Sequence, residues 1–336
     1  MTDLYQTVQT AFKGKRIAII GDLVADQFLS GSISRVSREA PVFILKHENT
    51  ETRPGGAANA AANIASLGGA PLLVGVTGDD AIGRLLTESL ERAEVDTQFI
   101  SKIENGTTTT KVRVLAGQNY SAKQQVIRID YENDVPLAAG LRSELTDSLR
   151  SAAAEANAIV VSDYGYGVVD DEIFGEARRL CDEYDIPLVV DSRFRLREFT
   201  GATSATPNQD EVETLLGRKF TDNDCADLCE ELGYGSLLVT CGNNGMLVIE
   251  PGRDALRIPA IGSTQPVDVT GAGDTVIAAF SLGLAAHLSV ADAASVANHA
   301  GGIVVMKKGT ATASIGELIA SLNGGGTTAA VWDVSA

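Results

Sequence analysis

The residue types best suited to chemistry stand together at residues 267–275 (VDVTGAGDT). Gly271 and Gly273 let backbone N–H groups turn toward a ligand, because glycine adopts conformations closed to other residues. We expect a helix to begin here, and its first turn adds unpaired N–H donors and a positive dipole end, which together bind phosphate groups. Asp274 would repel phosphate unless it has its own task, such as taking the proton of an attacking hydroxyl. The alternative is that Asp274 only caps the helix.

A second glycine-rich segment, residues 53–59 (RPGGAAN), also leads into an expected helix. The pair Gly55 and Gly56 permits close approach of a ligand to the backbone, and Asn59 offers an amide donor and acceptor. The first expected strand runs into residues 21–26 (GDLVAD), which carry two carboxylates. These lie where α/β sheets bind ligands, and they suit sugar hydroxyls, although ordinary turn residues would show the same pattern.

A fourth pattern occupies residues 206–211 (TPNQDE). Asn208 followed three residues later by Glu211 resembles a capping box, which marks the start of a helix. The chain has no G-x-x-x-x-G-K-[ST] phosphate loop and no G-x-S-x-G hydrolase elbow, and its G-x-G pairs lack the third glycine of a dinucleotide fingerprint. Cys225 and Cys229 stand one helical turn apart without a nearby partner for zinc, so packing in the core is the better interpretation.

Short apolar runs that alternate with helical patterns must position these residues. Their order predicts an α/β fold, a doubly wound and mostly parallel sheet flanked by helices. The expected strands are 15–21, 72–76, 158–162, 187–191, 236–240 and 245–249. The expected helices are 56–67, 81–93, 169–184, 208–216, 274–286 and 290–306. We expect residues 1–322 to form a single domain, and the glycine-rich residues 323–336 to form a flexible tail.

Two segments, 32–54 and 107–131, differ from this order of strands and helices, because their polar and apolar residues alternate with a period of two. They predict exposed antiparallel strands that form a small sheet outside the main layer. The chain as a whole has a net charge of −17, yet residues 102–130 carry five basic against two acidic residues. Cations such as Lys111 and Arg113 either protect strand edges against aggregation or belong to a lid that receives an anionic ligand. On the second interpretation, Arg113 and Arg128 would contact the anion.

The composition excludes several classes of protein. With 27 Lys+Arg against 44 Asp+Glu, the chain is badly suited to nucleic acid or to anionic lipid. No apolar run reaches the ~20 residues of a membrane helix, and the N-terminus has no signal-peptide core. Four cysteines in 336 residues do not form a disulfide scaffold, so a cytoplasmic protein is the expectation.

Taken together and in this order, the four motifs resemble the ribokinase or PfkB-type carbohydrate kinase family, over about residues 15–320. Within that family the similarity is closest to kinase domains that phosphorylate D-glycero-D-manno-heptose 7-phosphate at its anomeric hydroxyl. The narrower similarity is carried by residues 21–26, 34–42, 53–59, 162–164, 201–203 and 206–208. A kinase of the same fold for a hexose phosphate or a pentose, and a non-catalytic nucleotide or sugar sensor, stay open as alternatives.

The resemblance implies a role for each motif. Asp274 would be the catalytic base, and the backbone of Gly271, Ala272 and Gly273 would form the anion hole for the transferred phosphoryl group. The residues that would hold ATP and Mg²⁺ are Asn208, Glu211, Thr240, Gly242 and Asn298. The residues that would contact the sugar are Asp22, Asp26, Gly55, Gly56 and Asn59.

The resemblance also carries three further expectations. Asp268 and the stretch near Gly309 are similar to the monovalent-cation site, for K⁺, of some members. In several members the lids pair, which would make this chain a homodimer. Bifunctional members carry a second, nucleotidyltransferase domain whose motif has no counterpart here, so we expect a stand-alone kinase. One departure is at residues 191–194 (DSRF), where heptose kinases commonly have Asp-Pro-Lys-Gly. Arg193 thus keeps the charge of a lysine but changes its geometry.

Overall fold

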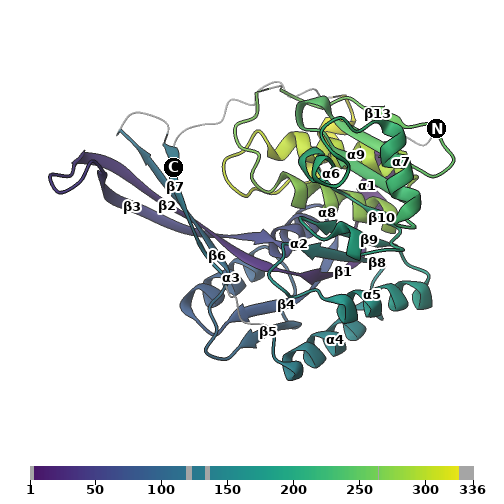
Figure 1. Ribbon diagram of the computed structural model, residues 1–336, viewed down its shortest axis with the longest axis horizontal. Coiled ribbons are helices and arrows are strands. Elements are labelled where there is room, and N and C mark those ends of the chain that lie inside the picture. Colours follow the sequence, from purple (N-terminus) through teal and green to yellow (C-terminus); the bar gives the residue numbers. More distant parts are fainter. Residues whose placement is uncertain (1–3, 119–122, 133–136, 264, 325–336) are drawn as a thin grey trace.

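The structure is a computed structural model that describes residues 4–118, 123–132, 137–263 and 265–324. The chain forms a large part with helices and strands and a small sheet that projects to one side of it (Figure 1). Most of the predicted tail, residues 325–336, lies outside the described residues.

The large part is built on a nine-stranded sheet in the order β13-β12-β11-β10-β9-β8-β1-β4-β5. In chain order its strands are β1 (Arg16–Gly21), β4 (Ala70–Gly78), β5 (Ile100–Ile103), β8 (Ala158–Asp163), β9 (Leu188–Ser192), β10 (Ser204–Ala205), β11 (Ser236–Thr240), β12 (Met246–Ile249) and β13 (Leu256–Ile258). Every neighbouring pair from β5 to β11 is parallel, and β12 and β13 are added antiparallel. The predicted doubly wound, mostly parallel sheet is confirmed.

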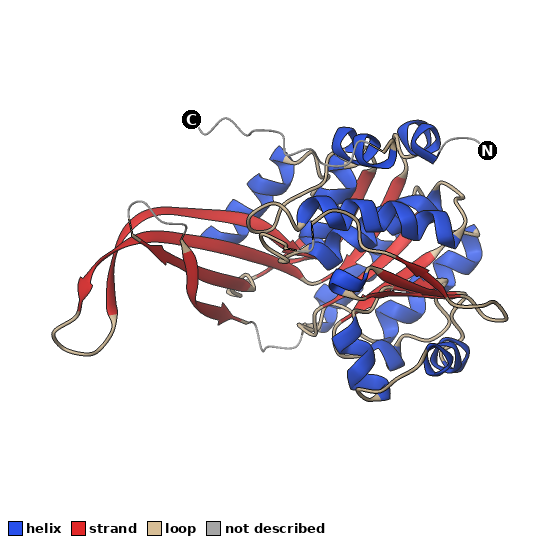
Figure 2. Ribbon diagram, turned by 90° about the horizontal axis from the view of Figure 1, so that it is seen from above, coloured by secondary structure: helices blue, strands red, loops and turns tan. Residues whose placement is uncertain are grey.

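Helices cover both faces of this sheet, because its strands are apolar on both sides. In β1, Ile17 and Ile19 point into one hydrophobic core, whereas Ala18 and Ile20 point into another. Figure 2 shows the helices on both sides of the strands. The first core receives side chains from α1 (Leu4–Ala11), α2 (Ala57–Ser66), α3 (Ala81–Arg92), α8 (Ala272–Ala285), α9 (Val290–Val304) and α10 (Ile315–Leu322). The second receives them from α4 (Ala139–Ala153), α5 (Asp171–Tyr184), α6 (Gln209–Leu216) and α7 (Asp222–Glu231).

All six predicted helices and all six predicted strands are present, and their ends differ from the prediction by no more than two residues. Four helices (α1, α4, α7 and α10) and the short strands β5, β10 and β13 were not predicted. Two short 3-10 turns, η1 (Leu196–Glu198) and η2 (Gly242–Asn244), also belong to the large part, and η2 joins β11 to β12. No helix within the described ranges is long and apolar enough to cross a membrane.

The small sheet has the strand order β3-β2-β6-β7. Its strands are β2 (Leu23–Val36), β3 (Phe43–Gly56), β6 (Thr110–Gly117) and β7 (Gln124–Tyr131). Both outer pairs are antiparallel as predicted, whereas the central pair of β2 and β6 is parallel. The sheet also begins earlier than predicted, since β2 starts two residues after β1 ends. Asp26 therefore lies on a strand of the small sheet and not in a turn.

The prediction that β6 is exposed is wrong for its basic side chains. Lys111 is only 7% exposed, whereas Val112 and Val114 are partly exposed. The alternation is the predicted one, but the basic side chains face inward, toward the large part. The interpretation of Cys225 and Cys229 as core residues is confirmed, since both are buried, and all four cysteines are free thiols.

Candidate active site

A cavity of about 440 Å³ lies where β8, β9 and β11 end, beside the start of α8 and against the small sheet. This is the edge at which α/β sheets bind ligands. The cavity brings together the predicted site residues Asp26, Gly56, Arg113, Arg128, Asn208, Glu211, Thr240, Gly271, Ala272, Gly273 and Asp274.

Asp274 is buried in the first turn of α8 and does not cap the helix. The residue at the N-cap position is Gly271, in the left-handed conformation. The two carboxylate oxygens of Asp274 accept hydrogen bonds from the Tyr164 hydroxyl, at 2.6 Å, and from Asn59 Nδ2, at 2.8 Å. Burial raises the pKa of Asp274 to about 6, although both donors oppose the rise. A carboxylate with this pKa is ionised at neutral pH and can accept a proton.

Gly271 is required for two reasons. Its φ of +77° is closed to most residues, and a Cβ there would lie 2.5 Å from Asn59 Nδ2. The carbonyl of Gly271 accepts the N–H of Thr275 and so closes the first turn. The N–H of Ala272 donates to Val269 O at 3.2 Å, which leaves the N–H groups of Gly271 and Gly273 as the better donors to an anion.

Part of the cavity wall is acidic, because Asp191 and Glu211 line it. Burial raises the pKa of Asp191 well above its ordinary value, and repulsion by Glu211 and Asp274 raises it further. Burial also raises the pKa of Glu211. Carboxylates in the wall of a cavity fit a hard cation such as Mg²⁺. No group of three acidic, histidine or cysteine side chains in the described part of the chain could hold a metal by itself, so ligand oxygens or water would have to complete the coordination.

Asn208 and Glu211 form the capping box that their spacing predicts. The Asn208 side chain accepts the N–H of Glu211 at 2.9 Å, and the Glu211 carboxylate accepts the N–H of Asn208 at 2.8 Å. Each side chain also lines the cavity. The start of α6 therefore fixes the position of both side chains in the cavity wall.

The small sheet supplies a cationic wall, made of Lys111, Arg113 and Arg128, to which the loop after β9 adds Arg193. Arg113 donates two hydrogen bonds to Asp26 Oδ1, at 3.0 and 3.2 Å, and both side chains are largely buried. Two residues that were predicted to contact substrate thus form an ion pair with each other.

A second pocket, of about 180 Å³, adjoins the first and contains the predicted residues Thr240, Gly242 and Asn298. The two pockets share Thr240, Val269, Ala272 and Gly273. Its other walls are largely apolar and include Met246, Ile261, Val276 and Val305. An apolar slot that ends at unpaired helix N–H groups suits a flat base joined to phosphates.

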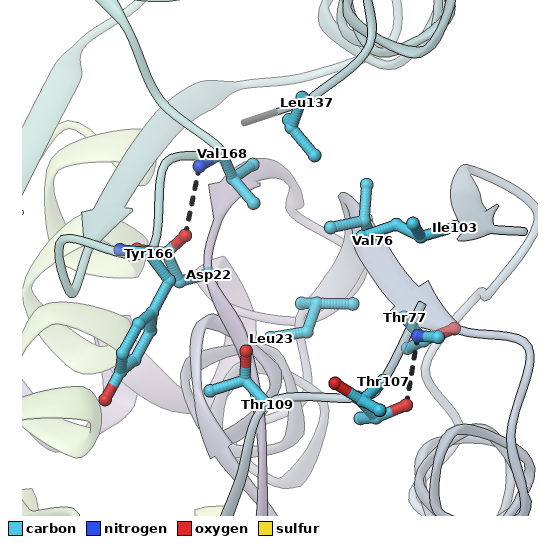
Figure 3. Close-up of a pocket in the computed structure, with 12 residues that line it drawn as sticks. Asp22, Leu23, Val76, Thr77, Ile103, Thr107, Thr109, Leu137, Tyr166 and Val168 are labelled. Atoms are coloured by element: carbon cyan, nitrogen blue, oxygen red, sulfur yellow. Dashed lines mark hydrogen bonds between the residues drawn. The ribbon is translucent and has the colours of Figure 1, made fainter. Parts of the chain in front are cut away.

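The structure does not bring Asp22 to the catalytic cavity. Its carboxylate accepts the N–H groups of Tyr164, Tyr166 and Val168, at 2.8, 3.1 and 3.2 Å. It borders a separate cavity of about 20 Å³ (Figure 3). That volume is room for about one water, so Asp22 does not contact a sugar there. Asp22 holds the loop after β8, because that loop would otherwise bury unpaired N–H groups.

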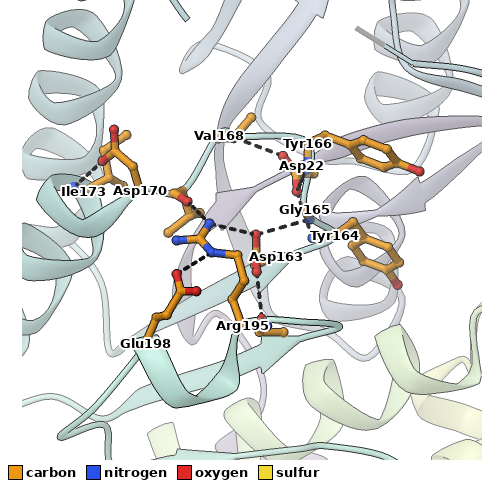
Figure 4. A network of polar contacts seen from close by, with 12 residues as sticks. Asp22, Asp163, Tyr164, Gly165, Tyr166, Val168, Asp170, Ile173, Arg195 and Glu198 are labelled. Atoms are coloured by element: carbon orange, nitrogen blue, oxygen red, sulfur yellow. Dashed lines mark hydrogen bonds and ion pairs between the residues drawn. The ribbon is translucent and has the colours of Figure 1, made fainter. Parts of the chain in front are cut away.

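A polar network behind this loop involves Asp163 at the end of β8 (Figure 4). Its carboxylate accepts the Ser192 hydroxyl at 2.7 Å and the N–H of Gly165 at 3.2 Å. The guanidinium of Arg195 lies 3.7 Å from Asp163 and donates to Val169 O at 2.9 Å. The network ties the ends of β8 and β9 together and fixes the loop that carries Tyr164.

Three further predicted residues lie outside the cavity wall. Asn59 is buried behind Asp274 and holds its carboxylate. Gly55 makes room for Asp26, since a Cβ at Gly55 would lie 2.6 Å from Asp26 Oδ2. Asp268 accepts the N–H groups of Thr270 at 3.0 Å and Gly309 at 2.9 Å, so the two predicted parts of the cation site do meet.

Sequence reasoning missed Tyr164 as a site residue and named Lys111 only as one of the cations of the small sheet. Tyr164 follows a buried parallel strand, and this position at the ligand-binding edge is a signal that was available. Lys111 was assigned to an exposed strand, and nothing in the alternation itself shows which face meets the large part.

Residues 15–316 match the profile described as pfkB family carbohydrate kinase. The chain belongs to this family. It is therefore a carbohydrate kinase, a phosphotransferase, and the resemblance carried by the four motifs is confirmed.

Curated relatives agree with this assignment. The Bifunctional protein HldE of Pseudomonas aeruginosa (strain LESB58) is 40% identical over 314 residues, which cover 90% of this kinase and 62% of the relative. The Bifunctional protein HldE of Hahella chejuensis is 39% identical over 313 residues, covering 91% and 63%. This kinase thus spans a little under two thirds of the length of these relatives.

Two solved structures share the fold at low sequence identity. Ribokinase from Arabidopsis thaliana, complexed with ribose and ATP, has a TM-score of 0.69 at 20% identity and covers 92% of this kinase and 99% of its own chain. Phosphofructokinase-2 from Escherichia coli, in complex with fructose-6-phosphate, has a TM-score of 0.72 at 18% identity, covering 92% and 98%. The ribokinase-like fold, with its small projecting sheet, is confirmed.

Proposed function

We propose that the protein uses ATP and Mg²⁺ to phosphorylate a phosphorylated sugar, namely D-glycero-D-manno-heptose 7-phosphate, to the 1,7-bisphosphate. One observation carries the proposal. A buried carboxylate, Asp274, lines a cavity that has a cationic wall and that adjoins a largely apolar pocket. The choice of heptose rests on the resemblance of residues 21–26, 34–42 and 53–59 to heptose kinase domains, and on the 40% identity to a Bifunctional protein HldE.

Asp274 is the general base of the proposed reaction. The acceptor oxygen of the sugar attacks the γ-phosphorus and forms the new P–O bond, and the bond from the γ-phosphorus to the β–γ bridging oxygen breaks, so that ADP leaves with the electron pair. The proton of the acceptor hydroxyl passes to the Asp274 carboxylate. Tyr164 and Asn59 hold that carboxylate in place, so little reorganisation is needed when the hydroxyl arrives.

The N-terminus of α8 stabilises the transferred group. The N–H groups of Gly271 and Gly273 and the helix dipole face the charge that develops on the phosphoryl oxygens. ATP occupies the pocket lined by Thr240, Gly242 and Asn298, with its phosphates directed toward Gly273. Asn208 and Glu211 would help to hold Mg²⁺, which would neutralise part of the phosphate charge. We assign the turn of Asp268 and Gly309 to a monovalent cation such as K⁺.

The small sheet is also the proposed contact of a homodimer. Apolar side chains on β7 are exposed in the single chain, among them Val126, Ile127, Ile129 and Tyr131. Exposed apolar side chains gathered on one strand mark contact surfaces. Sedimentation of the purified protein tests this, and a monomer at all concentrations would remove the proposal.

An ADP-release assay tests the proposed reaction. The protein is mixed with ATP, Mg²⁺ and each member of a panel of heptoses, hexoses and pentoses with and without a terminal phosphate. We expect the highest kcat/KM with heptose 7-phosphate. A hexose phosphate or pentose as best substrate would replace the heptose, and ATP binding without ADP release across the panel would favour a sensor.

A further inference from the structure

A second chamber, of about 760 Å³, continues from the catalytic cavity past Tyr164. Both spaces are bordered by Lys111, Arg128, Tyr164 and Arg193. Among the described residues, none that lines the nucleotide pocket also borders this chamber. A ligand that enters it therefore extends away from the nucleotide and remains continuous with Asp274.

The described residues place four basic side chains at the chamber, and two of the four are already paired with carboxylates. Arg128 forms an ion pair with Asp130 at 2.9 Å, and Arg142 forms one with Asp170 at 2.6 Å. By contrast, Lys111 and Arg193 form no ion pair and no side-chain hydrogen bond with the part of the chain that the structure describes.

Lys111 is an unusual residue in these surroundings, because it is 93% buried and its ammonium has no anionic partner within ion-pair distance among the described residues. Its Nζ lies 5.2 Å from the ring centre of Tyr164 and 5.5 Å from that of Tyr166, so two aromatic faces stabilise the cation only in part. Burial lowers the pKa of Lys111, the carboxylate of Asp26 opposes this, and repulsion by Arg193 lowers the pKa further. A buried charge without a partner is costly, so its retention points to a ligand that supplies the missing anion.

Arg193 borders the same two spaces from the loop that follows β9. Its guanidinium lies 5.5 Å from the ring centre of Phe194, which is itself exposed. Lys111 and Arg193 both border the catalytic cavity and the chamber, and repulsion between the two cations contributes to the lowered pKa of Lys111. A phosphate dianion between them would pair with both, and a guanidinium can bind it through two parallel hydrogen bonds.

We propose that Lys111 and Arg193 bind the terminal phosphate of the sugar-phosphate substrate at the mouth of this chamber. The inference rests on the proposed function and deepens it, since it names the side chains that distinguish a phosphorylated from an unphosphorylated sugar. It also moves the phosphate contact away from Arg113, whose guanidinium is occupied by Asp26.

The first test compares Lys111→Met and Arg193→Met with the control Lys123→Met. Lys123 belongs to the same small-sheet region, pairs with Glu48 and borders neither space. We expect each of the two site variants to raise the KM for the sugar phosphate roughly 10- to 100-fold, the size of a lost charge-assisted hydrogen bond. The KM for ATP should change less than about twofold, and the kcat/KM for the unphosphorylated sugar should fall far less than the kcat/KM for the sugar phosphate. Lys123→Met should behave as the wild type.

An equal loss of kcat/KM with the phosphorylated and the unphosphorylated sugar would overturn the proposal. A selective rise in the KM for ATP would overturn it as well. That second result would show that the two cations bind the γ-phosphate of ATP. Lys111→Arg is the conservative variant and should recover most of the affinity for the sugar phosphate, since it keeps a charge at the same place.

The second test does not depend on turnover. With the nucleotide pocket filled by a non-hydrolysable ATP analogue, inorganic phosphate should raise the Tm of the wild type and of Lys123→Met, but not that of Lys111→Met. Without phosphate, Lys111→Met should be as stable as the wild type or more stable, because it removes a buried unpaired charge. A large loss of stability, or an equal phosphate effect in all three proteins, would make Lys111 a structural residue. If the wild type phosphorylates no sugar phosphate, the proposed function fails, and this binding test still decides the role of Lys111.

Discussion

The hydroxyl of Tyr164 donates a hydrogen bond of 2.6 Å to Oδ1 of Asp274, across a separation of 110 residues in the chain. Burial and the nearby Asp274 raise the pKa of Tyr164 well above its ordinary value, so the hydroxyl remains a donor throughout the working pH range. The bond favours the ionised form of Asp274 and opposes the effect of burial. Tyr164 therefore acts as a positioning residue that keeps the base both oriented and charged.

Removal of that donor should shift the pH dependence of the reaction. The base works only when ionised, so the rate falls as pH drops through the pKa of Asp274, which is about 6. In Tyr164→Phe the carboxylate loses a donor while Asp26, Lys111 and Asp191 still face it, so its pKa should rise. The acid limb of the kcat/KM profile should move to higher pH. An unshifted limb with a uniformly lower rate would mean that Tyr164 is only structural.

The raised pKa of Asp274 also predicts a pH-dependent stability. In the unfolded chain the carboxyl titrates near 3.8, whereas in the folded protein it titrates near 6. Because the folded pKa is higher, ionisation destabilises the fold progressively between these values and fully above them, by about 3 kcal/mol. Asp274→Asn should therefore unfold at higher urea than the wild type at pH 8, with the difference shrinking toward pH 4. A constant difference across that range would contradict this assignment.

The ion pair of Asp26 with Arg113 predicts that substitution of Arg113 lowers the stability of the protein. Arg113→Met leaves a largely buried carboxylate without its partner, which should destabilise the protein by about 3 kcal/mol in urea unfolding. The double variant Asp26→Leu with Arg113→Met should recover most of that stability and not the activity. If the losses of stability of the two single variants instead add up in the double variant, the two side chains act independently.

The start of α8 should tolerate no side chain at Gly271. Gly271→Ala introduces both a strained positive φ and a Cβ 2.5 Å from Asn59 Nδ2, so it should cost about 2 kcal/mol and slow the reaction. Gly68→Ala is the matched control, because its φ is +90° but a Cβ there meets nothing within 4 Å. Gly68→Ala should lower the free energy of unfolding by only about 1 kcal/mol, which is the cost of the strained backbone alone. Equal losses would show that the contact with Asn59 is unimportant.

The sequence allowed good prediction of elements that are apolar on both faces. β1 and β8 are nearly continuous apolar runs, and α8 follows a glycine turn, so each was placed within two residues. Helices α7 and α10 were missed although each starts with a capping box, Thr221 with Asp224 and Ser314 with Glu317. These capping boxes were local signals from which the starts of both helices could have been predicted.

The site was predictable where one short segment carries it, as at Gly271 and Asp274. It was not predictable where its parts come from distant segments. Asp22 was assigned to the sugar because it follows a strand, but three backbone N–H groups from residues 164–168 occupy its carboxylate. The burial of Lys111 likewise depends on Tyr164 and Tyr166, which lie on another part of the chain.

The role of Asp274 in phosphoryl transfer is tested most directly by ADP release from Asp274→Asn with D-glycero-D-manno-heptose 7-phosphate and ATP, with ATP binding measured in parallel. The substitution keeps the shape of the side chain and removes the proton acceptor. We predict that turnover falls ~10²-fold or more while ATP binding stays close to that of the wild type. Near-normal turnover in this variant would contradict the assignment of Asp274 as the base.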